Sequence, residues 1–193
     1  MPFDAQKETP EEALLRRFSK GDPAAARLLT VQLTPRVMAH ATRMLGNRAE
    51  AEDVAQEAML RLWRIAPDWR RGEAKVTTWL YRVTANLCLD RLRRRTAEPL
   101  ESGPEPADPA ESAEASLQER DRADALQAAL GRLPDRQRLA VVLRHIDGLG
   151  NPEIAEIMGI SAEAVESLTA RGKRALTADL TGQREALGYQ DDR

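Results

Sequence analysis

The sequence of 193 residues predicts an all-α fold: two small helical domains joined by a flexible, acidic, proline-rich linker, with a helix-turn-helix in the second domain. Three observations carry this prediction. Strand-type alternation of apolar and polar residues is absent, helix-capping residues recur in both halves, and residues 96–116 (TAEPLESGPEPADPAESAEAS) contain almost nothing that a core could bury. The length allows one domain of ordinary size or two small ones, and the linker favours two.

In the first half, local signals define one long helix. Asp22 followed by Pro23 is typical of an N-cap residue with proline at the first helical position. The helix should run toward Leu45, with a break or kink near Pro35, because proline lacks the backbone N–H that a helix interior uses. Gly46 should end it.

Two further helices are expected in the first half. Asn47 can cap a helix over residues 47–66, which ends before a proline. Residues 67–76 (PDWRRGEAKV) should form a loop. Thr77 or Thr78 is then expected to cap a helix over residues 79–95.

The second half should contain four helices, separated by glycine and proline residues. Ser161 is expected to cap the last one, with Glu163 in its first turn, where the helix dipole favours an anion. The chain after about Leu180 should fray. The predicted helices cover residues 117–130, 134–148, 151–159 and 161–180.

Composition excludes several classes of protein. A single cysteine, Cys88, rules out a disulfide framework and a Cys-based zinc site within the chain, and it fits a reducing, cytoplasmic location. No apolar run approaches the ~18–20 residues of a membrane span, and the acidic N-terminus is not that of a signal peptide. No phosphate loop or Cys/His pairing indicates an enzyme, a metal or a cofactor. His40 and His145 should be polar helix residues, and Cys88 a small buried hydrophobe.

A net charge near zero conceals a strong segregation of charge. Residues 61–95 carry ten basic and three acidic side chains, whereas residues 96–125 carry two and nine. One interpretation is a polyanion-binding module attached to an acidic tether. The other is a solvated helix face followed by a disordered linker, and the charge runs alone favour it.

Residues 152–176 (PEIAEIMGISAEAVESLTARGKRAL) have the pattern of a DNA-reading helix-turn-helix. Gly172 should let another helix approach closely. The alternative is an ordinary α-hairpin with a solvated face, and the glycine spacing with the capping serine favours DNA binding. The expected inward residues are Ile154, Ile157, Met158, Ile160, Val165, Leu168, Thr169 and Leu176. The opposite face carries residues that a major groove accepts, namely Glu163, Ser167, Arg171 and Arg174, and Glu166 and Ala170 lie on its flank.

Two helices of the first half have outward faces of different chemistry. On helix 47–66, the apolar Leu60 among acidic residues is typical of a protein-docking face, although a solvated face with one leucine fits equally well. On helix 79–95 and the loop before it, basic groups alternate with aromatic ones. That pattern suits a nucleic acid whose bases can leave the stack. The alternative is that Trp69 and Trp79 anchor the core, and at least one of them should.

Four stretches, in this order, resemble bacterial sigma factors of the extracytoplasmic-function (ECF, group four) type. They are AEDVAQEAMLRLWR, TWLYRVTANLCLDRLRRR, LPDRQRLAVVLRHIDGLGNPEIAEIMGIS and AVESLTARGKRAL. Together they cover most of residues 22–180 outside the linker. Each alone is moderately specific, and all four in order are strongly specific.

The resemblance implies an alternative sigma factor that binds RNA polymerase core, directs it to promoter DNA and is held inactive by an anti-sigma factor. Residues 1–95 would be sigma region two, which reads and melts the minus-ten element. Residues 117–193 would be region four, which reads the minus-thirty-five element as duplex, and residues 96–116 would be the linker. No catalytic role, cofactor or membrane insertion is implied.

The resemblance also assigns residues to each task. Core polymerase would contact Asp53, Gln56, Glu57 and Leu60. The minus-ten element would contact Trp69, Arg70, Arg71, Lys75, Trp79, Arg82, Asn86 and Arg93. The minus-thirty-five element would contact Ser161, Glu163, Glu166, Ser167, Arg171, Lys173 and Arg174.

One position departs from the family pattern. Where the family often has Lys or Arg before a serine, this chain has Val165-Glu166-Ser167. A carboxylate near DNA repels phosphate, so Glu166 must read a base edge, lie away from the backbone, or pair with a neighbour such as Lys173. The promoter sequence common in the family therefore does not transfer.

Two other classes compete with this interpretation. A DNA-binding regulator of the response-regulator type would share the helix-turn-helix, but it would need an α/β phosphoacceptor domain, and residues 1–95 show no strand pattern. A helical scaffold that binds only protein is the second. Binding to polymerase core would separate both from a sigma factor.

Overall fold

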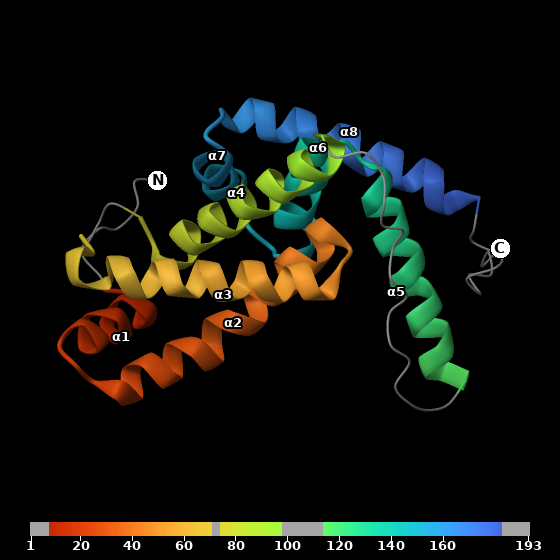
Figure 1. Cartoon of the computed structure of the whole chain (residues 1–193). Helices are drawn as coiled ribbons and strands as arrows, with labels where there is room; N and C mark the ends of the chain where they lie inside the picture. Colours follow the sequence, from red (N-terminus) through yellow and green to blue (C-terminus); the bar gives the residue numbers. More distant parts are fainter. Residues whose placement is uncertain (1–7, 71–73, 98–113, 183–193) are drawn as a thin grey trace.

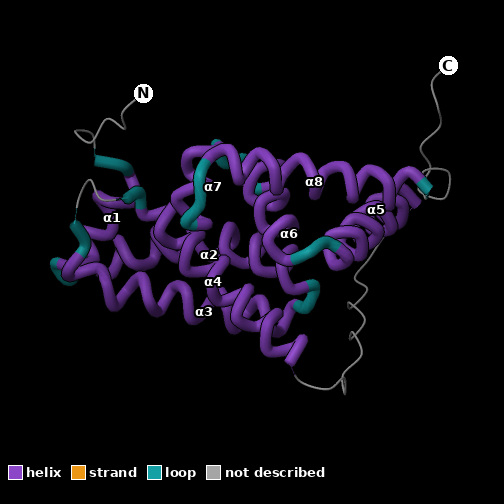
Figure 2. The backbone as a smooth tube through the Cα atoms, turned by 90° about the horizontal axis from the view of Figure 1, so that it is seen from above, coloured by secondary structure: helices purple, strands orange, loops and turns teal. Residues whose placement is uncertain are grey.

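The computed structural model describes residues 8–70, 74–97 and 114–182, and all regular structure in them is helical, as predicted (Figure 2). The first half contains α1 (Pro10–Ser19), α2 (Pro23–Leu45), α3 (Arg48–Ile65), the 3₁₀ turn η1 (Ala66–Asp68) and α4 (Val76–Ala97). The second half contains α5 (Glu114–Arg132), α6 (Asp135–Val141), the π-helical turn η2 (Val142–Ile146), α7 (Asn151–Met158) and α8 (Ala162–Thr181) (Figure 1). None of the described helices has the length and apolarity that a membrane crossing requires.

Capping residues set several helix boundaries as predicted. The side chains of Asp22, Asn47 and Ser161 each accept a hydrogen bond from a backbone N–H in the first turn of the helix that follows. Gly46 and Gly159 end α2 and α7 in the left-handed conformation, with φ of 65° and 62°, which glycine adopts without a Cβ clash. These local signals therefore position the helices of both halves.

One predicted interruption is absent and one predicted boundary is wrong. Helix α2 continues through Pro35, so the break that the sequence offered as one of two outcomes does not occur. Proline leaves the carbonyl of Val31 without its helical partner, but both residues are exposed, so water can satisfy that carbonyl. Helix α4 begins at Val76, so Thr77 and Thr78 lie inside it and cap nothing. Because Val76 is fully buried and Thr78 is 4% exposed, core packing extends the helix past the polar cap signal.

Helix α1 is an addition to the predicted elements. A capping box begins it: the Thr9 hydroxyl accepts from the Glu12 N–H (3.2 Å), and the Glu12 carboxylate accepts from the Thr9 N–H (2.9 Å). Of the predicted linker, residues 98–113 lie outside the described residues. Its two ends are helical, because α4 reaches Ala97 and α5 already begins at Glu114.

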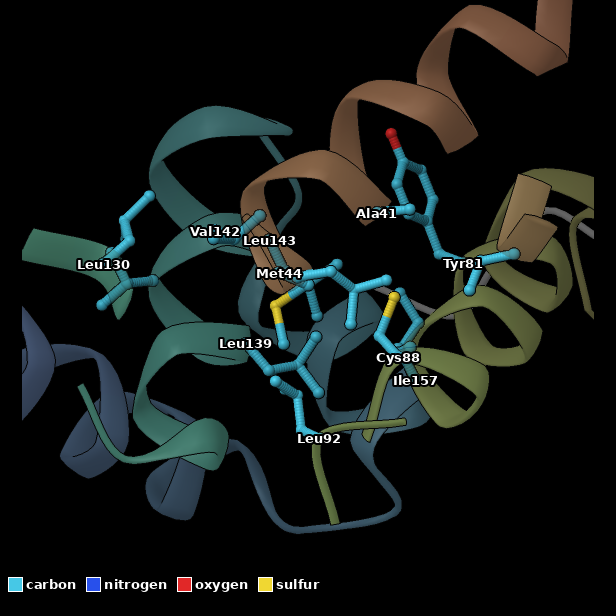
Figure 3. Packing of buried hydrophobic residues seen from close by; sticks show 14 of the residues in the cluster. Ala41, Met44, Tyr81, Cys88, Leu92, Leu130, Leu139, Val142, Leu143 and Ile157 are labelled. Atoms are coloured by element: carbon cyan, nitrogen blue, oxygen red, sulfur yellow. The ribbon is translucent and has the colours of Figure 1, made fainter. Parts of the chain in front are cut away.

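The buried side chains form two clusters, and the larger one joins both halves of the chain. The smaller cluster lies within the first half and includes Leu15, Leu29, Leu33 and Leu62, all at most 1% exposed. The larger cluster combines residues of α2, α3 and α4 with residues of α5 to α8 (Figure 3). Its members include Met44, Tyr81, Cys88 and Leu92 from the first half and Leu130, Leu139, Val142, Leu143, Ile154 and Ile157 from the second. We call this packing of the two halves the closed arrangement.

Buried polar groups also join the two halves. His40, predicted only as a polar helix residue, is fully buried on α2, and its Nδ1 lies 2.6 Å from Asp147 Oδ2 at the end of η2. The Arg138 guanidinium is buried and donates to the Met44 carbonyl at the end of α2 (2.6 Å). It also donates to two carbonyls at the corner between α5 and α6. One side chain thus satisfies helix-end carbonyls of both halves.

The predicted close helix approach at Gly172 is confirmed. A Cβ at this position would lie 2.6 Å from Val141 Cγ2 and 3.2 Å from the Gln137 carbonyl oxygen. Both residues belong to α6, so α6 packs directly on the backbone of α8. A side chain larger than hydrogen at this position would push the two helices apart.

Candidate protein and nucleic-acid interfaces

The outward face of α3 carries the residues predicted to bind polymerase core. Its inward stripe, which includes Ala51, Val54, Ala58 and Leu62, is fully buried. Asp53, Gln56 and Leu60 are exposed on the opposite side, with Leu60 40% exposed. Arg61 donates to Glu57 (2.7 Å) and thereby lowers the pKa of that carboxyl. The face thus combines acidic and amide side chains with one accessible leucine, which lies nearest the C-terminal end of α3.

An aromatic and basic cleft lies where α3, η1 and α4 meet. Trp69 and Trp79 pack edge to face with ring centroids 5.9 Å apart, and both are partly buried against the first-half core, as the core-anchor alternative expected. The cleft has a volume of about 470 Å³. Its lining residues are Ile65, Asp68, Trp69, Arg70, Ala74, Trp79, Arg82 and Glu156. The indole N–H of Trp69 is buried and has no hydrogen-bond partner among the described residues.

The structure brings together only some of the residues predicted to read the minus-ten element. Trp69, Arg70, Trp79 and Arg82 line the cleft, and Lys75 precedes α4 beside it. Asn86 and Arg93 are exposed farther along α4, and Arg93 pairs with Asp90. Arg71 lies outside the described residues.

Two cations of this region contact α7 of the second half. Lys75 Nζ lies 2.8 Å from Glu153 Oε1, and this hydrogen bond lowers the pKa of the Glu153 carboxyl. Arg82 Nη2 donates to the Glu156 carbonyl (2.8 Å), and the Glu156 carboxylate lies 3.5 Å from it. These contacts explain why Glu156 appears in the lining of the cleft.

Helix α8 presents the predicted outward face to solvent. Glu163, Ser167, Arg171 and Arg174 are all exposed, while Val165 on the opposite side is fully buried. A hydrogen bond from its own backbone N–H lowers the pKa of the Glu163 carboxyl, and a second one from the Ser161 hydroxyl acts in the same direction. The helix dipole favours the carboxylate there for the same reason. The helix-turn-helix geometry is therefore as predicted.

Glu166 and Lys173 do not form the pair suggested by the sequence. Asn151 of α7 donates its amide hydrogen to the Glu166 carboxylate (3.2 Å). Lys173 instead lines a small apolar cleft beside His145 and Leu176. Lys173 is also exposed, but it lines this cleft and not the face that carries Ser167, Arg171 and Arg174.

Sequence reasoning missed the residues that join the halves: His40, Asp147, Arg138, Glu153 and Glu156. A signal for His40 was present, because it falls in register with Leu33, Val37, Ala41 and Met44 on the buried side of α2. Its partner lies 107 residues away, and no local pattern marks that contact. The other members are charged residues on helices, where solvent exposure is the default expectation.

Two helical units, one with an acidic outward face and an aromatic cleft and the other with a helix-turn-helix, define a DNA-binding transcription protein. Residues 29–98 match the family model for Sigma-70 region 2, and residues 123–176 match that for Sigma-70 region 4. The chain belongs to the ECF sigma factors of bacterial RNA polymerase.

Individual relatives support this membership. The chain is 31% identical over 184 residues to the ECF RNA polymerase sigma factor SigW of Bacillus subtilis, and the match covers 86% of this chain and 94% of SigW. It is 39% identical over 153 residues to SigE of Mycolicibacterium smegmatis, covering 77% of this chain and 58% of SigE. The sigma factor RpoE, solved in complex with the anti-sigma factor NepR from Bartonella quintana, has the same fold: the TM-score is 0.62 at 19% identity, covering 80% of this chain and 96% of RpoE.

Proposed function

We propose that this chain recruits RNA polymerase core in the cytoplasm and directs it to a specific set of promoters, without catalysing a reaction itself. Residues 1–95 act as region two, residues 96–116 as the linker and residues 117–193 as region four. The observation that carries the proposal is the combination of both sigma regions, in order, with an exposed recognition face on α8.

Core polymerase binds the outward face of α3. Asp53, Gln56 and Glu57 supply a polar, acidic surface, and Leu60 supplies an apolar contact beside it. Helix α3 packs on α2, η1 and α4, so its outward face is accessible in the closed arrangement. Core binding therefore needs no rearrangement of the two halves.

The cleft lined by Trp69 and Trp79 captures unstacked bases of the minus-ten element. Each aromatic ring offers a stacking surface, and base stacking on aromatic side chains is worth roughly 1–3 kcal/mol per base. The buried Trp69 N–H has no partner among the described residues and can donate to a base when the cleft opens, while Arg70, Arg82 and Lys75 attract the backbone. Arg71, Asn86 and Arg93 extend this surface.

Helix α8 enters the major groove of the minus-thirty-five element. Arg171 and Arg174 supply donors for guanine or phosphate, and Ser161 and Ser167 supply hydroxyls for phosphate. Glu163, Glu166 and Lys173 complete the proposed contact set. The Asn151 amide holds Glu166 in the free protein and competes with a base for its carboxylate.

The two DNA-reading surfaces cannot reach both elements in the closed arrangement. Elements named minus ten and minus thirty-five lie ~25 base pairs apart, which is ~85 Å along B-form DNA. The α4 cleft and the helix-turn-helix are in direct contact through α7 (Figure 1). Residues 98–113 can span at most about 55 Å when fully extended, which allows the halves to separate on the promoter.

An anti-sigma factor controls this separation. RpoE has the same fold and was solved in complex with the anti-sigma factor NepR, which motivates the proposal for this chain. A partner that binds only the closed arrangement would stabilise it by mass action.

Run-off transcription with purified core polymerase and a genomic promoter pool tests the function. Addition of this protein should produce new transcripts whose upstream sequences share two elements at constant spacing. Specific duplex binding without any binding to core would instead support a DNA-binding regulator that is not a polymerase subunit. Core binding without DNA binding would support a scaffold.

A further inference from the structure

We propose that the acidic edge of α7, formed by Glu153 and Glu156, is an internal mask that covers the basic surface of the α4 cleft and keeps single-stranded DNA out of the free protein. This inference rests on the proposed function of the cleft as the minus-ten site. It concerns the regulation of that site by the second half of the same chain.

The contacts resemble those that a nucleic acid backbone would make. The Glu153 carboxylate lies 2.8 Å from Lys75 Nζ, and the Glu156 carbonyl accepts from Arg82 Nη2 at 2.8 Å. Phosphate oxygens are the ligands that ammonium and guanidinium groups bind in DNA complexes, by the same charge-assisted hydrogen bonds. A strand that occupies these cations must displace both glutamates.

The mask also narrows access to the aromatic surface. Glu156 lines the cleft together with Trp69 and Trp79, although it belongs to a different half of the chain. A negative charge at this position repels an incoming phosphate, in addition to occupying Arg82. The effect is thus both steric and electrostatic.

Apolar packing beneath the ion pairs holds α7 in place. Ile154 and Ile157 of α7 are at most 4% exposed and belong to the same cluster as Cys88 and Leu92 of α4 (Figure 3). The ion pairs are themselves partly exposed, with side chains 33–43% accessible. They therefore add a modest, salt-sensitive stabilisation of α7 in this position on α4. Removal of their charges should loosen the mask without unfolding the chain.

The test measures binding of the full-length protein to a fluorescent, mixed-sequence 20-nucleotide single strand by anisotropy at low salt. The mask variant is Glu153→Gln with Glu156→Gln; Gln at position 153 retains an acceptor for the capping hydrogen bond with Gly150. The control variant, Glu52→Gln with Glu119→Gln, removes the same net charge from two exposed sites on α3 and α5. Each pair is also combined with Lys75→Gln and Arg82→Gln.

We expect the mask variant to bind the strand about threefold to tenfold more tightly than the wild type, because a larger fraction of molecules exposes the cleft. The control should change affinity less than twofold, and loss of Lys75 and Arg82 should remove the gain. Alkylation of Cys88, the only cysteine, should accelerate by a similar factor in the mask variant, since opening exposes α4.

Two results would overturn the mask, and they are distinguishable. Equal affinities of mask variant and control, with binding still weakened by loss of Lys75 and Arg82, would leave the cleft as the DNA site but remove the mask. No effect of losing Lys75 and Arg82 in any background would remove the proposed function of the cleft, and the mask with it.

Discussion

Helices α4 and α8 carry the two surfaces proposed to read promoter DNA, and these surfaces differ in how accessible they are in the closed arrangement. The outward face of α8 is exposed, whereas α7 lies against α4 and contributes Glu156 to its cleft. The difference arises because α7 packs on both helices, with Ile154 and Ile157 buried between the halves. Helix α7 thus packs beneath α8 and leaves the outward face of α8 exposed, while it also covers part of the cleft on α4.

The largest expected effect tests whether the α4 side is truly covered. Burial raises the pKa of Cys88 to about 12 from its ordinary value near 9. The Cys88 side chain is fully buried, so iodoacetamide reaches the thiol only when the two halves open. Alkylation at pH 8 should therefore be much slower in the closed protein than in the urea-unfolded chain, by about a hundredfold or more. Iodoacetamide kinetics followed by mass spectrometry measure the two rates; a rate near that of the unfolded chain would show that α4 is open.

The next experiment tests whether the buried Arg138 guanidinium joins the two halves of the chain. Arg138→Ala leaves the carbonyls at the ends of α2 and α5 without their donor, in a buried site, and should lower the free energy of unfolding by about 3 kcal/mol. The control Arg136→Ala, at an exposed position of the same helix, should change it by less than about 0.5 kcal/mol. Urea titrations give both values. Equal losses in the two variants would mean that Arg138 does not link the halves.

A third experiment separates core binding from closure. Asp53→Ala with Glu57→Ala should weaken binding to polymerase core by about 2 kcal/mol, because both side chains lie on the proposed docking face. Helicity and Cys88 alkylation of the free protein should not change, since this face lies away from the second half. A core-binding titration with the exposed-site control Glu119→Ala tests this, and unchanged affinity of the double variant would exclude the α3 face.

The smallest expected effect concerns the exposed outward face of α8. If Glu166 leaves Asn151 to accept from cytosine N4, Glu166→Lys should alter preference at one or two minus-thirty-five positions by about 1 kcal/mol. It should also strengthen salt-sensitive binding to all sequences, because a cation replaces an anion near phosphate. Binding-site selection on both proteins checks this; the same selected motif from both would exclude base reading by Glu166.

Local sequence signals predicted much of the fold but none of the closure. Caps at Asp22, Asn47 and Ser161 act within one turn, so the sequence alone locates them. The start of α4 was misplaced because burial of Val76, a tertiary effect, outweighs the threonine cap signal. Helix α1 could have been found from its Thr9–Glu12 capping box.

The features of the candidate sites also divide into those with a local sequence signal and those that depend on tertiary contacts. Exposure of the α8 face and of Leu60 follows from helical periodicity, which a single sequence contains. The contacts of Lys75 with Glu153 and of Arg82 with Glu156 span 78 and 74 residues, and their formation depends on how two folded halves meet. Charge patterning gave a polyanion-binding module only as the less favoured of two interpretations, and it gave no sign of these contacts within the chain.

The π-helical turn η2 determines how the closed arrangement depends on the number of residues between α6 and Asp147. Its wider bonding pattern, as in the Asp147 N–H to Val142 carbonyl bond of 2.9 Å, accommodates an extra residue within the turn. Deletion of one residue within the turn would restore α-helical winding and leave Asp147 in nearly the same direction, because the wide turn already absorbs one extra residue. Deletion of one residue from α6, before the turn, would instead rotate Asp147 by about 100° away from His40. Homologous chains that are one residue shorter in α6 should therefore be unable to fold shut in this way, whereas a change of length in the turn itself should be tolerated.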